Sequence, residues 1–124
     1  MKFKDSLDMI VENVEDTLAA LIVGIDGIII EKSINEGEFD EKLNLELIAA
    51  EKTSLLKSSL RTADDIDIGE LEELNLFTER YCFLIKLITK EYYFLVIMKR
   101  SGTYGKSRFL LKKAKLILEK EFII

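Results

Sequence analysis

Three short runs of the chain are apolar almost throughout, and they restrict its fold more than any other feature. The runs span residues 18–23, 81–89 and 92–99. A half-buried strand alternates apolar and polar residues, whereas a strand that is buried on both faces is apolar continuously. The runs therefore predict the central strands of a sheet, and such a sheet needs helices on both of its faces.

The first run continues into a hairpin signal. Asp26-Gly27 lies between it and the apolar residues 28–30. An Asp-Gly pair in this setting is typical of two antiparallel strands closed by a type I′ turn, which needs positive φ. We therefore expect strands at about 17–25 and 28–34.

Charge and periodicity predict the remaining strand and two of the helices. Residues 71–79 alternate partly and carry charges, which is typical of an edge strand. Apolar residues at helical spacing predict an N-terminal helix and a last helix over about 106–121, after a loop at 101–105. The apolar faces of these helices comprise Phe3, Leu7, Ile10, Val11 and Val14, and Leu110, Ala114, Ile117 and Leu118.

A long central helix is expected from about Asp40, as its N-cap, to Thr62. One stripe suits a sheet and comprises Leu45, Ile48, Ala49, Leu55, Leu56 and Leu60. A second stripe of apolar and small residues comprises Leu43, Leu47, Ala50, Ser54 and Ser58. Surface helices usually carry charge on that side. Either this helix packs on both sides, one of them against a partner chain, or it is an exposed helix with a few aliphatic residues.

The predicted order of elements is αββαβββα. Tight turns between consecutive strands imply antiparallel pairing. The expected fold class is α+β, a three-layer sandwich of a five-stranded antiparallel sheet with helices on both faces. A length of 124 residues suits one domain, which we expect to span 1–124.

The net charge of −5 is distributed unevenly. Residues 1–80 hold 8 Lys and Arg against 20 Asp and Glu, and residues 81–124 hold 10 against 3. The basic end is either a binding segment for nucleic acid or anionic lipid, or one part of a domain whose two halves attract each other. Its high apolar content favours the second interpretation, so no nucleic-acid partner is expected.

The composition excludes several kinds of chemistry. The chain has no histidine and a single cysteine, Cys82. Nucleophilic triads lack their imidazole base, common zinc sites lack their ligands, and no disulfide can form within the chain. Residues 1–16 do not resemble a signal peptide, and no apolar run approaches the roughly 18 residues of a membrane span. A cytoplasmic protein is expected.

Three motifs have simpler explanations than catalysis. Residues 102–107 end in Gly-Lys-Ser, but a phosphate-binding loop would need glycine in place of Arg100 and a parallel sheet. The acidic segment 64–67 does not match a calcium loop and is expected to be a solvated turn. Cys82 and the aromatic residues of the two long runs are expected to pack in the core.

An ordered series of segments resembles the roadblock domain family and its bacterial MglB-like GTPase regulators, over about residues 3–122. The resemblance rests on the run 18–30 with Asp26-Gly27-Ile28, on Leu47-Ile48-Ala49-Ala50, on Gly69-Glu70-Leu71-Glu72, on Tyr93-Phe94-Leu95-Val96, and on Gly105-Lys106-x-Arg108 with residues 110–114. Members of this family form dimers through the central helix and the third strand.

The resemblance implies a homodimer, or a pair with a second roadblock-type chain, that binds a small Ras-like GTPase. It implies no cofactor, no metal and no catalytic residue, so an enzyme is not expected. The expected dimer interface comprises Leu43, Leu47, Ala50, Ser54, Ser58, Leu71, Leu74 and Leu76, and Glu46, Lys57 and Arg61 are expected to flank a partner. A structural adaptor without GTPase contact and a small-ligand sensor are the alternatives.

Overall fold

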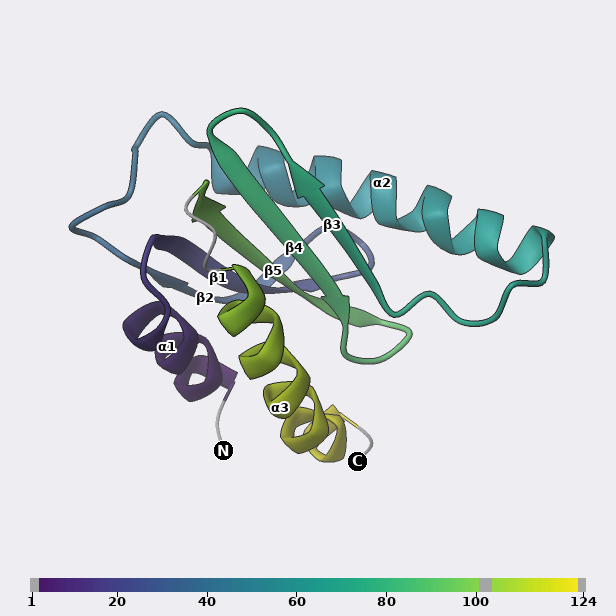
Figure 1. Cartoon of the computed structure of the whole chain (residues 1–124). Helices are drawn as coiled ribbons and strands as arrows, with labels where there is room; N and C mark the ends of the chain where they lie inside the picture. Colours follow the sequence, from purple (N-terminus) through teal and green to yellow (C-terminus); the bar gives the residue numbers. More distant parts are fainter. Residues whose placement is uncertain (1–2, 101–103, 123–124) are drawn as a thin grey trace.

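The computed structural model describes residues 3–100 and 104–122, and the side chains of 105–116 within the last helix. The elements are α1 (Phe3–Asn13), β1 (Thr17–Gly24), β2 (Ile29–Ile34), α2 (Leu45–Asp65), β3 (Glu73–Phe77), β4 (Tyr81–Leu87), β5 (Tyr92–Lys99) and α3 (Tyr104–Phe122). All strand pairs are antiparallel, in the order β2-β1-β5-β4-β3. Helices α1 and α3 lie on one face and α2 on the other (Figure 1). The predicted fold class and element order are confirmed.

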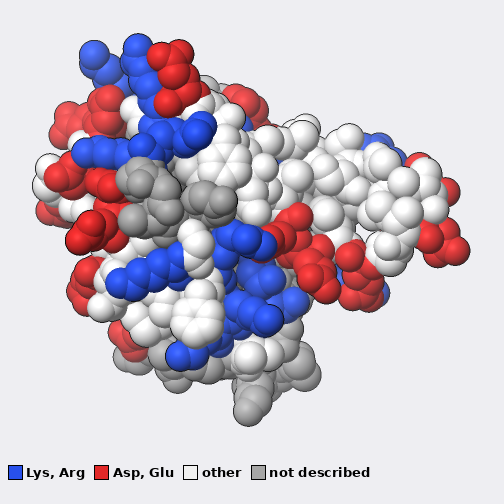
Figure 2. All heavy atoms as spheres, in the orientation of Figure 1, with Lys and Arg blue, Asp and Glu red and all other residues white. Residues whose placement is uncertain are grey.

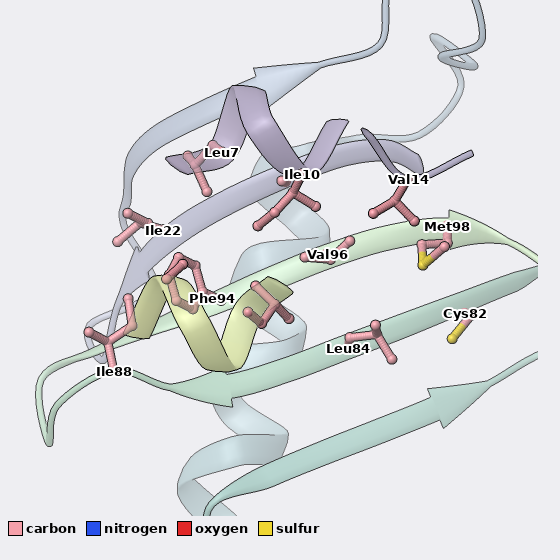
Figure 3. Close-up of a cluster of buried hydrophobic side chains, with 13 residues drawn as sticks. Leu7, Ile10, Val14, Ile22, Cys82, Leu84, Ile88, Phe94, Val96 and Met98 are labelled. Carbon is pink, nitrogen blue, oxygen red and sulfur yellow. The ribbon is translucent and has the colours of Figure 1, made fainter. Parts of the chain in front are cut away.

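The apolar runs are continuous because each central strand contributes to two cores. Along β5, Phe94 and Val96 point to the core under α1 and α3, and Tyr93 and Leu95 point to the core under α2. In Figure 3, side chains of α1 contact those of β1, β4 and β5 in the core under α1 and α3. Consecutive residues of a strand point to opposite faces, so the middle of each central strand is apolar at every position, and the lysines of β4 and β5, Lys86 and Lys99, lie near the strand ends.

The β1–β2 turn differs from the predicted type I′ turn. Only Gly27 of the Asp-Gly pair has a positive φ, +88°. The N–H of Gly24 donates to the carbonyl of Ile28 (2.9 Å), and the N–H of Gly27 donates to the carbonyl of Gly24 (2.8 Å). The hairpin therefore closes through a three-residue loop, 25–27, with a glycine in the left-handed region at its end.

The predicted bounds of α2 were wrong at both ends. The helix begins at Leu45, and Asn44 is its N-cap because its side chain accepts a hydrogen bond from the N–H of Leu47 (3.0 Å). Asp40 instead closes an earlier turn, in which its carboxylate accepts from the N–H of Lys42 (2.9 Å). Leu43 consequently lies before the helix and packs partly buried into the core under α2.

Two further predictions about helix faces need correction. Leu55, expected on the face toward the sheet, is 38% exposed, because the sheet covers a narrower arc of α2 than the apolar pattern suggests. Helix α3 begins at Tyr104, within the predicted loop, and buries Leu111 as well as Ala114. The side chains of Ile117 and Leu118 lie outside the described residues.

The two edges of the sheet differ. At β2, the carbonyl of Lys32 accepts a hydrogen bond from Lys4 Nζ of α1 (2.7 Å), and the N–H of Lys32 donates to Glu31 Oε1 (3.1 Å). The pairing of β2 with β1 is also irregular opposite Val23. Side-chain cover and a bulge both hinder further strand pairing. Strand β3 forms the other edge and pairs with β4 alone.

Ion pairs join the acidic and basic halves of the chain. Lys99 of β5 pairs with Glu38, and Arg108 of α3 pairs with Glu73 of β3. The hydrogen bond with Glu38 raises the pKa of Lys99 above its ordinary value. The packing of the two halves against each other, expected from the charge distribution, is therefore present.

Candidate functional site

The candidate site is the surface that α2 and the β3 edge share. Lys52 Nζ lies 4.6 Å from the centre of the Phe83 ring on β4, which shows that this flank of α2 faces β4 and β3. Leu55 follows Lys52 on the same flank and remains exposed. An apolar side chain at the margin of a helix, next to a sheet edge, can contact a second molecule that pairs with that edge.

The end of α2 extends this surface with further uncharged residues. Ile66, the C-cap of α2, and Ile68 are exposed. Figure 2 shows a largely uncharged lobe at the right, where α2 ends in Figure 1. Neither isoleucine was predicted to belong to an interface. The signal that could have indicated them is their place in an acidic turn, beside Asp65 and Asp67, where a solvated turn does not require large apolar residues.

Strand β3 contributes the predicted leucines to this surface. Leu74 and Leu76 point to the same face of the sheet as α2 and are half-buried against that core, as is Leu71 in the approach to the strand. The N-terminal end of β3 is joined to α3 through the ion pair of Glu73 with Arg108. Partial burial acts to raise the pKa of Glu73, but the hydrogen bond and charge of Arg108, together with the charge of Lys86, lower this pKa below its ordinary value.

The predicted interface residues on α2 spread over its outward-facing arc. Leu47 is 60% exposed and Ser58 is exposed, and helical spacing places both next to Ser54, between the flank of Leu55 and the opposite flank. Ala50 instead lies beside the β1–β2 turn, where a Cβ on Gly27 would be 3.8 Å from the Ala50 Cα. Since β2 and β3 are at opposite edges, Ala50 is on the flank away from β3.

Ala50 belongs to a second exposed row. Steps of four, three and four residues place Ala50, Ser54, Lys57 and Arg61 along one side of a helix, and all four are exposed. Glu46 is exposed at the beginning of the same side. The three charged residues expected to flank a partner therefore lie together, away from the Leu55 flank.

A buried hydrogen bond fixes α2 on the sheet. Thr53 Oγ1 and Tyr93 Oη are 2.6 Å apart, and both contact the Ala49 carbonyl, at 2.7 and 3.3 Å. Burial raises the pKa of the Tyr93 phenol, against the smaller opposite effect of the Thr53 hydrogen bond. The contact holds the side of α2 that carries Thr53 against β5, and the opposite side of the helix faces outward.

As far as the structure describes them, the remaining motifs do not assemble into a chemical site. Cys82 is buried in β4, and burial raises the pKa of its thiol. Asp64, Asp65 and Asp67 are exposed at the end of α2, and the described residues contain no group of three or more acidic or cysteine side chains placed to hold a metal ion. Residues 102 and 103 of the Gly-Lys-Ser motif lie outside the described part, and Lys106 is exposed on α3.

A cleft of about 550 Å³ lies at one end of the sheet. The end of α2, residues 70–72, the β4–β5 turn and Lys115 line it. Its wall carries charges of both signs, from Glu70, Glu72 and Lys90 among others. This position is beyond the sheet face that α2 covers, so the cleft is not the sheet-centred cavity expected of a ligand sensor.

An antiparallel sheet between one helix and a pair of helices, with an open β3 edge beside α2, defines the class of three-layer α+β proteins to which the chain belongs. Within that class, it has the fold of the roadblock/LC7 domain. A Roadblock/LC7 domain from Streptomyces avermitilis matches with a TM-score of 0.84 over 100% of both chains, at 11% identity. The resemblance inferred from the sequence is thus confirmed for the fold.

Two proteins of Myxococcus xanthus share this fold with the chain. MglB matches with a TM-score of 0.83 over 98% of both chains, at 15% identity. MglC matches with a TM-score of 0.67 over 98% of this chain and 99% of that one, at 24% identity. No family model and no curated protein matches the sequence. Among the described residues, no helix has the length and apolar character needed to cross a membrane.

Proposed function

We propose that the chain is a non-catalytic, homodimeric regulator or adaptor of a small Ras-like GTPase. The observation that carries the proposal is the exposed Leu55 on the flank of α2 toward β3, an edge strand, with Ile66 and Ile68 exposed at the end of the same helix. Soluble proteins rarely leave large apolar residues next to a strand edge unless another molecule covers them.

A two-fold axis perpendicular to the sheet would join two copies at this surface. It would pair β3 with its copy in antiparallel orientation and continue the sheet from one chain into the other. The two α2 helices would then lie side by side on one face, with Leu55 near the contact and Leu47 and Ser58 on the outward-facing arc next to it. A solved MglB structure has a tetrameric arrangement, so copies of this fold do associate.

The similarity in fold to MglB and MglC supports the regulatory part of the proposal. Leu71, Leu74 and Leu76 would be covered in the dimer, whereas the row of Ala50, Ser54, Lys57 and Arg61 would remain accessible. We assign this row, with Glu46, to the GTPase partner. A second roadblock-type chain in place of the identical copy would use the same surface.

The dimer is tested by changing one leucine of the shared surface. Leu55→Glu should convert the dimer to a monomer in light scattering, because two carboxylates would be brought into an apolar contact. Ile30→Glu is the matched control, since Ile30 is 42% exposed on β2 and Leu55 is 38% exposed. A dimer mass that survives Leu55→Glu, or is lost in Ile30→Glu, would contradict the interface.

The GTPase partner is tested by affinity capture from the native cell extract with GTP analogue or with GDP. Recovery of a small GTPase that depends on the nucleotide, and is lost in Lys57→Glu/Arg61→Glu, supports the proposal. Recovery of other proteins irrespective of nucleotide would indicate the structural adaptor instead. The charge-reversed variant should retain the dimer mass, which separates loss of the partner from loss of the dimer.

A further inference from the structure

The outer face of α3 combines exposed apolar and basic side chains in a regular pattern. Phe109 is 58% exposed and Leu116 is 63% exposed. They are seven residues apart, so they lie on one line along the helix, about 10 Å from each other. Lys112 and Lys113 are exposed between them, and Lys113 Nζ is 5.1 Å from the centre of the Phe109 ring.

These side chains have no part in the core. The inner face of α3 is formed by Ser107, Leu111 and Ala114, which are buried. Phe109 and Leu116 lie on the opposite arc, between Lys112 on one side and Lys106 and Lys113 on the other. Packing among the described side chains therefore does not account for two large apolar residues on this arc.

Residues 105–116 of α3 carry a net positive charge, whereas the rest of the chain carries a net negative charge. Residues 105–116 contain five basic residues and no acidic one, whereas the whole chain has a net charge of −5, which leaves −10 for the remainder. Figure 2 shows the basic side chains gathered over α3 in the lower part of the view. Such a distribution turns this face toward a negatively charged surface and the rest of the molecule away from it.

We propose that the outer face of α3 docks on an anionic lipid bilayer, with the helix lying along the membrane surface. Phe and Leu flanked by Lys and Arg are the residues that enter the interface between headgroups and acyl chains. The lysines would contact the lipid phosphates while Phe109 and Leu116 enter between the headgroups. A nucleic acid would leave both apolar residues against its phosphates, and an acidic protein would need a groove shaped to this convex face.

The position of α3 makes lipid binding compatible with the proposed function. Helix α3 lies on the sheet face opposite α2 (Figure 1). The two-fold axis of the proposed dimer would place both copies of α3 on the same side, so a dimer would bind a vesicle through two contacts. This increase in avidity rests on the proposed dimer, whereas the lipid contact itself does not.

Insertion is tested with a single fluorescent reporter, because the chain contains no tryptophan. Phe109→Trp should show a blue shift of its emission with vesicles of phosphatidylcholine and phosphatidylglycerol, and no shift with phosphatidylcholine alone. Ile28→Trp, at an exposed position of the β1–β2 hairpin, is the control and should not shift. An unchanged emission of Phe109→Trp with the anionic vesicles would overturn the proposal.

The charge contribution is tested by vesicle co-sedimentation. Reversal of Lys106, Lys112 and Lys113 to Glu should weaken binding about a hundredfold or more. Reversal of the exposed Lys42, Arg80 and Lys90 changes the net charge equally and should leave most of the binding. Equal loss in both variants would mean unspecific adsorption and would overturn the assignment to α3.

The apolar contribution and the dependence on the dimer are separated by two further variants. Phe109→Ser/Leu116→Ser should weaken binding about tenfold, and wild-type binding of this variant would contradict insertion. Monomeric Leu55→Glu should still bind anionic vesicles, with lower affinity than the dimer. If Leu55→Glu remains dimeric, the proposed interface fails while the lipid contact is still decided by the α3 variants.

Discussion

The hydroxyl groups of Thr53 and Tyr93 meet 2.6 Å apart beneath α2 and share the Ala49 carbonyl. Both residues are buried. Their hydrogen bond links the middle of α2 to the central strand β5, and it adds a specific polar contact to the apolar packing of this helix on the sheet.

Loss of this contact should destabilise the chain. Tyr93→Phe should lower the free energy of unfolding by about 1 kcal/mol, since a buried hydrogen bond is removed. Thr53→Val should cost a similar amount, and the double variant less than the sum of the two, because both changes remove the same bond. Urea denaturation gives all three values. Fully additive losses would show that the two hydroxyls act independently.

Gly27 should be sensitive to any side chain. Its φ of +88° is unfavourable for other residues, while a Cβ there would be in ordinary contact with Ala50 at 3.8 Å. Gly27→Ala should therefore cost about 1–2 kcal/mol through backbone strain alone. Gly37→Ala, at an open position without positive φ, should be neutral or slightly stabilising. Thermal or urea unfolding compares the two, and equal effects would contradict the strain.

Substitutions can distinguish Asn44, the N-cap of α2, from Asp40, which closes the turn before the helix. Asn44→Ala should reduce the free energy of unfolding by about 1 kcal/mol, because the N–H of Leu47 loses its acceptor. Asp40→Ala should cost less, since Asp40 closes an exposed turn rather than the helix. A larger loss for Asp40→Ala, measured in urea, would move the start of the helix back to position 40.

Acid should weaken the contact between β3 and α3. Although burial acts to raise it, the pKa of Glu73 is lowered from its ordinary value in the folded chain, chiefly by Arg108. Its contribution to stability is therefore complete above the unfolded pKa and is lost as the pH falls through the folded pKa. Glu73→Gln should lose about 1 kcal/mol or less at neutral pH and show a shallower decline of stability below pH about 4.5.

Urea denaturation as a function of pH measures this decline. Arg108→Gln should also make the decline shallower, because it removes the hydrogen bond and charge that lower the pKa of Glu73 most. An acid dependence that is unchanged in both would show that other carboxylates cause it.

The fold was predictable because the sequence of each central strand shows by itself that both faces of the strand are buried. Phe94 and Leu95 belong to different cores, and a chain in which both must be buried has few arrangements other than helices on both sides of a sheet. The beginning of α2 was not predictable by the same means, since Asp40 and Asn44 are both good caps. Burial of Leu43 before the helix decides between them.

The candidate surface was predictable in part. The periodicity of α2 indicated Leu47 and Ser58 as outward residues, but it could not show that Ala50 lies against the hairpin turn. That information is tertiary, since it depends on where Gly27 is placed. Leu55 was misassigned because helical spacing indicates the direction of a side chain, whereas the width of the sheet decides whether it is covered.

The difference between the two sheet edges limits how large an assembly can become. A sheet with two open edges could add copies at both and grow into a filament. Here Lys4 and Glu31 occupy the backbone groups of Lys32 at the β2 edge, so strand addition is left to β3. A contact that uses the same edge on both copies is saturated once it forms. In the proposed dimer, growth by strand pairing would therefore end at two chains, and the side chains that cover Lys32 on β2 would prevent further polymerisation.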